Sequence, residues 1–250
     1  MEDVIVIKIG GAASDALTEN FFEKIRLWQE NGKKIVLVHG GGHYISTMMQ
    51  KLNLPIATHQ GLRVTNKKAL EVTRMVLIGQ VQPTIMTKLK RNGFKAIGLS
   101  AADDGLLTAV PITEPAIGLV GEITRVKTEL LENLLESDLM TVIAPLGMDA
   151  GGNWLNVNAD MAACAIAGAL HAERLYLLTD VPGVKIEGQV AAQLSTKRIA
   201  TLIKQGIVTG GMEPKLKSAS TALQQNVQAV YITDDLHHSG TRIKSEVHSL

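Results

Sequence analysis

The sequence predicts an α/β fold, in which helices alternate with the strands of a mainly parallel, open sheet. Two segments carry this prediction, 4–9 (VIVIKI) and 35–38 (IVLV). Both are almost continuously apolar, which is typical of strands that are covered on both faces. A helical pattern over 18–31 connects them and ends before Gly32, so we expect a right-handed βαβ unit.

Composition narrows the class of protein. The chain has 250 residues, of which 46% are hydrophobic and 20% charged, as in soluble globular proteins. A formal net charge of +1 gives no reason to expect a nucleic acid or an anionic membrane as partner. The single cysteine, Cys164, excludes an internal disulfide, and its alanine-rich surroundings indicate inert core. No apolar run is long enough to span a membrane and no signal peptide is present, so we expect a cytoplasmic protein.

Glycines follow both of the first two strands. Gly10 and Gly11 come after Lys8, and Gly40, Gly41 and Gly42 come before a helical segment at 44–52. The backbone N–H groups of the turn at 40–42 would lie at the N-terminus of the helix that follows, where anions are favoured. A lysine at the end of a strand is placed to contact a phosphate group. Two other readings stay open: a glycine turn that serves packing alone, and a lysine that extends into solvent.

The segment 53–61 contains Pro55 and no clear period, so we expect an extended segment or loop that leads to Arg63 and Thr65. Thr65 can cap the next helix. The planar guanidinium of Arg63 fits a carboxylate through two hydrogen bonds, and a surface arginine paired with a neighbour is the alternative that stays open.

A long helix is expected over 66–92, with a kink where Pro83 meets the carbonyl group of Gly79. Its wide apolar face suggests contact with a second subunit, and burial within its own subunit is the alternative.

In the middle of the chain the pattern predicts a strand at 95–99, short hairpin strands within 106–126, a helix at 128–137 and a strand at 140–145. A glycine-rich loop at 147–154 leads into LNVNAD, in which Asn156 and Asn158 alternate and should point the same way. Asp160 begins the next helix, where it could be no more than a cap.

The last third repeats the pattern, with a strand at 174–179, a helix at 197–205 and a final strand at 228–232. A flexible loop over 206–217 enters a helix at 216–225, and Lys215 lies where that helix starts. No linker divides the chain, so we expect two lobes on one continuous sheet.

These features together predict phosphoryl transfer. Lys8 and Lys215 each lie beside glycines at an element's end, and Asp160 could pair with both. The sequence has neither the GxxxxGK[ST] phosphate loop nor the GxGxxG dinucleotide fingerprint. What remains is a reaction arranged by positioning and charge compensation.

The motifs also carry a resemblance. In order along the chain they are KIGG at Lys8, HGGG at His39, GLRVT at Gly61, GEI at Gly121, NVNAD at Asn156, LTDVPGV at Leu178 and GGMEPK at Gly210. This set resembles the amino acid kinase family, and GLRVT with NVNAD points to its acetylglutamate branch. The resemblance implies a three-layer αβα sandwich around a mainly parallel open sheet. It also implies an N-terminal lobe at 1–171 for acyl substrate and dimerisation, and a C-terminal lobe at 172–250 for ATP.

The resemblance further implies that ATP, carried with Mg²⁺, phosphorylates the side-chain carboxylate of N-acetyl-L-glutamate in arginine biosynthesis. Lys8 and Lys215 would neutralise the transferring phosphoryl group while Asp160 orients them. Gly41 and Gly42 would contact substrate and phosphate, Gly10 and Gly11 the phosphate, and Arg63 and Asn156 the end of the substrate that does not react. The stretches that match nucleotide binding are Asp180, Val181, Pro182, Gly183, Val184, Lys185, Ile207, Val208 and Thr209. No metal ligand is expected from the protein, and His39 is expected to stabilise its turn.

The chain departs from the family pattern in two places, GLSAADD at 98–104 in place of GLSGxDG, and Pro83 within the long helix. Because the first strand comes so early, we expect an arginine-insensitive homodimer that forms through the helix 66–92. Two other functions stay open: a kinase of the same fold for another acidic amino acid such as acetylaminoadipate, and a non-catalytic module that binds an amino acid or a nucleotide.

Overall fold

A computed structural model describes residues 3–10 and 17–245. Among these residues the central sheet contains eight strands. Their order is β14 (Gln193–Ser195), β16 (Thr241–Lys244), β15 (Ala229–Thr233), β11 (Arg174–Leu178), β1 (Val4–Ile9), β2 (Lys34–His39), β8 (Met140–Ile143) and β5 (Ala96–Leu99). All neighbouring strands pair in parallel except β15 and β16, which confirms the expected mainly parallel sheet. The pairing of β1 with β11 also makes the sheet continuous across the expected lobe boundary at 171/172, while the division into two functional lobes stays a prediction.

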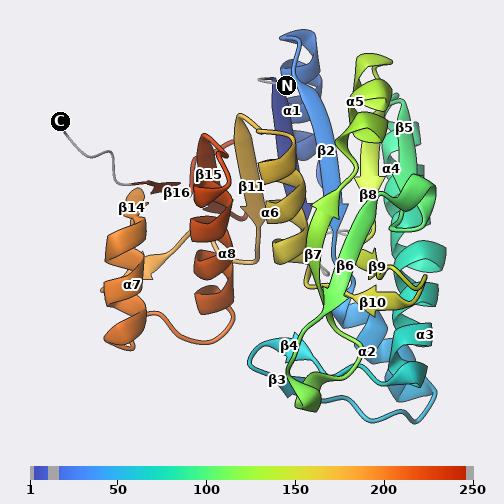
Figure 1. Cartoon of the computed structure of the whole chain (residues 1–250). Coiled ribbons are helices and arrows are strands. Elements are labelled where there is room, and N and C mark those ends of the chain that lie inside the picture. Colours follow the sequence, from blue (N-terminus) through green and yellow to red (C-terminus); the bar gives the residue numbers. More distant parts are fainter. Residues whose placement is uncertain (1–2, 11–16, 246–250) are drawn as a thin grey trace.

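Helices cover both faces of this sheet, so the three-layer αβα architecture is confirmed (Figure 1). One face carries α5 (Thr128–Glu136), α6 (Ala159–Ala169), α7 (Thr196–Lys204) and α8 (Met212–Gln224). The other carries α1 (Glu19–Glu30), α2 (Gly42–Lys51), α3 (Lys67–Val76) and α4 (Gln82–Arg91). Strand β1 is fully buried between the layers because its residues alternate, with Val4 and Val6 in one core and Ile5, Ile7 and Ile9 in the other.

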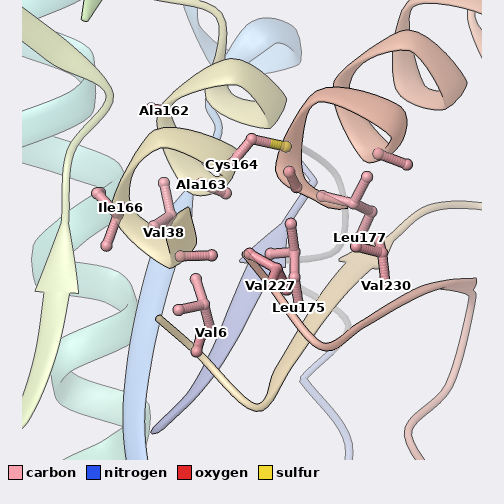
Figure 2. Packing of buried hydrophobic residues seen from close by; sticks show 14 of the residues in the cluster. Val6, Val38, Ala162, Ala163, Cys164, Ile166, Leu175, Leu177, Val227 and Val230 are labelled. Atoms are coloured by element: carbon pink, nitrogen blue, oxygen red, sulfur yellow. The ribbon is translucent and has the colours of Figure 1, made fainter. Parts of the chain in front are cut away.

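The small residues of α6 let this helix lie close to the sheet. Figure 2 shows Ala162 and Ala163 above Val6 of β1 and Val38 of β2. Cys164 points toward α8, where its Sγ donates to the carbonyl oxygen of Ser218 at 3.1 Å. Burial raises the pKa of this thiol, so Cys164 is an inert core residue, as expected.

The smaller strands include several that the sequence did not predict. A second sheet has the order β10 (Trp154–Asn156), β9 (Leu146–Met148), β6 (Leu107–Pro111) and β7 (Gly121–Val126), and two short hairpins are β3 (Thr58–His59) with β4 (Leu62–Arg63) and β12 (Lys185–Ile186) with β13 (Gln189–Val190). The segment 147–154 is therefore a hairpin rather than only a loop. The prediction that the strand at 228–232 is the last was wrong, since β16 follows it, and α8 begins at Met212 rather than at 216.

The long helix is unbroken from Lys67 to Arg91, but a π-helical turn (Leu77–Val81) joins α3 to α4. The irregularity expected at Gly79 and Pro83 takes this form because Pro83 has no N–H to donate to the carbonyl of Gly79. The expected cap was wrong: Asn66, not Thr65, accepts the N–H of Ala69 at 2.9 Å. Among the helices that the structure describes, none combines the length and apolar character needed to cross a bilayer.

Candidate active site

Three charged residues that lie far apart in the sequence meet at the carboxyl end of β1. The Nζ atom of Lys8 is 2.7 Å from one carboxylate oxygen of Asp160, and the Nζ atom of Lys215 is 2.8 Å from the other. They come from β1, from the first turn of α6 and from the first turn of α8. The expectation that Asp160 could pair with both lysines is confirmed as geometry, while the catalytic roles of the three residues stay a prediction.

Local contacts hold two members of the triad formed by Lys8, Asp160 and Lys215. Lys8 is only 4% exposed, and its Nζ also donates to the backbone carbonyl of Leu178 at 3.3 Å. Asn158 is the N-cap of α6, because its Oδ1 accepts the N–H groups of Asp160 and Met161. The cap is therefore Asn158, and the carboxylate of Asp160 is left for the two lysines.

Burial and charge oppose each other at the triad. Burial alone would raise the pKa of Asp160, but the neighbouring ammonium groups of Lys8 and Lys215 bring it below its usual value. Burial lowers the pKa of Lys8, which the carboxylate of Asp160 partly offsets. With all three groups ionised, two ammonium groups share one carboxylate, which leaves one positive charge. A buried surplus of positive charge suits an anionic ligand.

The triad forms part of the wall of a cavity of about 300 Å³. Most of the expected substrate and phosphate residues line it as well, namely Gly10, Gly41, Gly42, Arg63 and Asn156. Gly11 lies outside the described residues. The remaining wall is largely apolar and includes Ile45, Leu62 and Leu77, so the space suits a small ligand with acidic ends and an apolar middle.

The glycine turn after β2 brings the N-terminus of α2 to this cavity. Gly41 is the N-cap of α2, and none of the side chains that the structure describes caps the first N–H groups there. A Cβ atom on Gly41 would lie 2.7 Å from a methyl group of Leu77, whereas one on Gly42 would meet nothing within 4 Å. Of these two glycines, packing therefore requires only Gly41.

This difference makes a matched pair of variants. Gly41→Ala is expected to destabilise the protein by about 1–3 kcal/mol, because the new methyl group overpacks against Leu77. Gly42→Ala is expected to keep or slightly raise stability, since alanine is the better helix residue at the start of α2. Urea unfolding of both variants measures this, and an equal loss of stability in the two would contradict it.

Arg63 and Asn156 both line this cavity. The Nη2 atom of Arg63 donates to the carbonyl of Gly42 at 3.0 Å and to the hydroxyl of Ser46 at 2.8 Å. Burial lowers the pKa of Arg63, but an arginine keeps its charge at any physiological pH. Thr65 connects the two residues: its hydroxyl donates to the carbonyl of Arg63 at 2.8 Å and accepts from the amide of Asn156 at 3.1 Å. The sequence predicted a helix cap at Thr65, and nothing local in the sequence indicates its hydrogen bond to Asn156, which lies 91 residues further along the chain.

His39, at the end of β2, is completely buried. Its Nδ1 lies 3.3 Å from the carbonyl oxygen of Gly40, in agreement with the expected turn-stabilising bond. Burial lowers the pKa of His39 to about 4, so the ring is neutral at pH 7 and adds no charge to the site.

A second and larger cavity of about 1060 Å³ adjoins the first, and Asp160 and Lys215 line both. It lies along α6 and α8, beside Glu122 and Ile123 of β7. Among the described residues that line the two cavities, none comes from the expected nucleotide stretches 180–185 and 207–209. The N–H of Val184 instead donates to the hydroxyl of Thr241 at 2.8 Å, which anchors its turn beside β16. The nucleotide-binding role of these stretches stays a prediction.

Comparison with known proteins gives the context for this site. The model of the amino acid kinase family matches residues 3–234. The chain belongs to this family. Relatives in the amino acid kinase family include the acetylglutamate kinase of Listeria welshimeri, 58% identical over 247 residues that cover 99% of both chains. The acetylglutamate kinase of Leuconostoc mesenteroides is 48% identical and covers 95% of this chain and 97% of its own.

A solved structure agrees with the family assignment. A protein of Streptococcus mutans superposes with a TM-score of 0.94 at 35% identity, covering 98% of this chain and all of that one. The fold expected for the amino acid kinase family is therefore confirmed by a close structural neighbour. Membership of a kinase family also implies that the chain uses ATP.

Proposed function

We propose that this chain transfers a phosphoryl group from ATP to the side-chain carboxylate of N-acetyl-L-glutamate, giving N-acetyl-L-glutamyl 5-phosphate for arginine biosynthesis. The observation that carries the proposal is the triad of Lys8, Asp160 and Lys215, of which Lys8 and Asp160 are buried, at the wall of a small cavity. The name of the relatives that match over the full chain, acetylglutamate kinase, supports the choice of substrate.

The cavity offers groups for both ends of such a substrate. The guanidinium of Arg63 and the amide of Asn156 would bind the end that does not react, since together they offer N–H donors to a carboxylate and to an acetamide oxygen. Leu62 and Leu77 would contact the carbon chain between the ends. The reacting carboxylate would then face the lysines.

The residues of the triad and the glycine turns would provide charge compensation. ATP, bound with Mg²⁺, supplies the γ-phosphoryl group, which forms a bond to a carboxylate oxygen as its bond to the leaving diphosphate oxygen breaks. Lys8 and Lys215 would bind the equatorial phosphoryl oxygens, while Asp160 keeps both ammonium groups directed to one point. The N–H groups at Gly41 and Gly42 and the glycines after β1 would add neutral donors.

No general base is required. The side-chain carboxylate of glutamate has a reference pKa near 4.3 and is ionised at neutral pH, so its oxygen can attack without losing a proton. The neutral, buried ring of His39 fits this scheme, because a proton acceptor is not needed there.

The C-terminal residues 180–185 and 207–209 would bind the rest of the nucleotide, in a lobe at 172–250 that follows a substrate lobe at 1–171. We further propose a homodimer that forms through the helix 66–92. Met75 of α3 supports it, because this large apolar side chain is 58% exposed.

The test is acyl phosphate trapping. Purified protein is incubated with ATP, Mg²⁺ and either N-acetyl-L-glutamate, N-acetyl-L-aminoadipate, glutamate or aspartate. Hydroxylamine then converts the acyl phosphate to a hydroxamate, which is detected as its coloured iron(III) complex. Hydroxamate with acetylglutamate alone is expected. A larger yield with another acid would keep the reaction class and change the substrate, and no hydroxamate with any of the four would overturn the proposal.

A further inference from the structure

Gln82 lies in the layer between α4 and the sheet, and its side chain is committed to the backbone of two strands. It is 8% exposed, and its Nε2 donates to the carbonyl oxygens of Leu99 and Val142, both at 2.9 Å. Leu99 is the last residue of β5, and Val142 lies near the end of β8. Both amide protons are therefore used to attach α4 to the carboxyl end of the sheet.

The strand makes room for this side chain. A Cβ atom on Gly98 would lie 2.8 Å from the Cδ atom of Gln82, a distance that real side chains do not adopt. Gly98 therefore lets the amide reach Leu99 and Val142, which places Gln82 rigidly against the sheet.

The backbone of Gln82 continues the connection. Its N–H donates to the carbonyl of Leu77 and closes the π-helical turn. Pro83 follows directly and cannot donate to Gly79, which favours the wider turn at this point. One residue thus ties the turn to the sheet through its side chain and to Leu77 through its backbone.

Leu77 and Val81 of the π-helical turn form the surface against which Gly41 packs. The position of a Cβ on Gly41 is 2.7 Å from Leu77 Cδ2 and 3.4 Å from Val81 Cγ2. Leu77 also lines the small cavity. These two side chains therefore limit how closely the glycine turn can approach the π-helical turn.

We infer that Gln82 is a positioning residue, which fixes the backbone N–H groups of the glycine turn at Gly41 and Gly42 through the π-helical turn. The inference rests on the proposed function, in which these N–H groups contact the phosphoryl group. Small displacements matter there, because an error of about 1 Å in the position of a catalytic group costs roughly 100-fold in rate.

The decisive comparison is Gln82→Met against Gln224→Met. Both remove the amide of a helical glutamine, but Gln224 is exposed in the last turn of α8, outside the helix proposed for the dimer. For Gln82→Met we expect kcat for hydroxamate formation to fall roughly 10- to 100-fold with KM for acetylglutamate little changed. Hydrogen exchange of the peptide that contains residues 40–46 should become faster at a temperature where the variant is fully folded. Gln224→Met should match the wild type in both measurements.

A purely structural role of Gln82 predicts a lower melting temperature with unchanged kcat and unchanged exchange at 40–46, and that result would overturn the inference. Gly98→Ala is the second variant, because its methyl group displaces the amide of Gln82 without removing it. It should give the same pattern if Gln82→Met does not fold. The exchange measurement needs no substrate, so a wild type without kinase activity would overturn the proposed function while the position of the glycine turn is still tested.

Discussion

Replacing Lys8 with alanine is expected to lower the rate of acyl phosphate formation by roughly 100- to 1000-fold. Lys8 is buried beside Asp160 and at the wall of the small cavity, so under the proposed function its ammonium group would compensate the charge of the transferring phosphoryl group. Trapping with hydroxylamine at saturating ATP and acetylglutamate measures the effect, and the loss should appear mainly in kcat.

Two further lysine variants sharpen this result. Lys8→Arg keeps the charge but brings a larger, planar group into a space that holds a single ammonium, so little activity should return. Lys34→Ala is the control and should retain full activity. Lys34 is the first residue of β2, at the end of the strand away from the glycine turn, and it pairs with the exposed Asp138. A Lys8→Ala enzyme within about twofold of the wild type would remove Lys8 from the mechanism.

Replacing Asp160 with asparagine is expected to damage both stability and activity. The buried ammonium of Lys8 would lose its counterion, a change that costs roughly 3–5 kcal/mol when one partner of a buried pair is removed. The pKa of Asp160 is lowered in the folded state, so the ionised carboxylate stabilises the fold above its unfolded pKa of 3.8. The difference in stability between wild type and Asp160→Asn should therefore be largest near neutral pH and shrink as the pH falls below about 4.

A double variant separates charge from packing. If the loss comes from the uncompensated ammonium group, Asp160→Asn combined with Lys8→Met should be more stable in urea than Asp160→Asn alone. If the loss of stability in the double variant equals the sum of the losses in Asp160→Asn and Lys8→Met, the ion pair contributes no coupling energy.

The sequence allowed the fold to be predicted because its signals are local. The apolar runs of β1 and β2, the glycines that follow them and the helical periodicity of α1 each lie within a dozen residues. Lys8 and Lys215 could be singled out for the same reason, since each lies beside glycines at the end of an element. Similarity to known kinases then confirmed the family.

The features that the sequence did not reveal depend on distant partners or on neighbours that compete. Thr65 and Asn66 can both cap a helix, and so can Asn158 and Asp160. In each pair the side chain that did not become the cap reaches a distant segment: Thr65 bonds Asn156, and Asp160 bonds Lys8 and Lys215. The hydrogen bonds of Gln82 to Leu99 and Val142 likewise span 17 and 60 residues, so nothing local indicates that this glutamine is buried.

The central position of β1 has a consequence for how the chain acquires activity during synthesis. One edge of β1 can pair with β2 soon after both leave the ribosome. The other edge cannot pair until β11 has been synthesised, about 170 residues after β1. At roughly 5–20 residues per second that interval lasts on the order of ten to thirty seconds. Throughout it, an apolar strand edge is open to wrong pairing, which makes the nascent chain a natural client for chaperones. Because Lys215 arrives later still, the triad is among the last parts of the molecule to assemble.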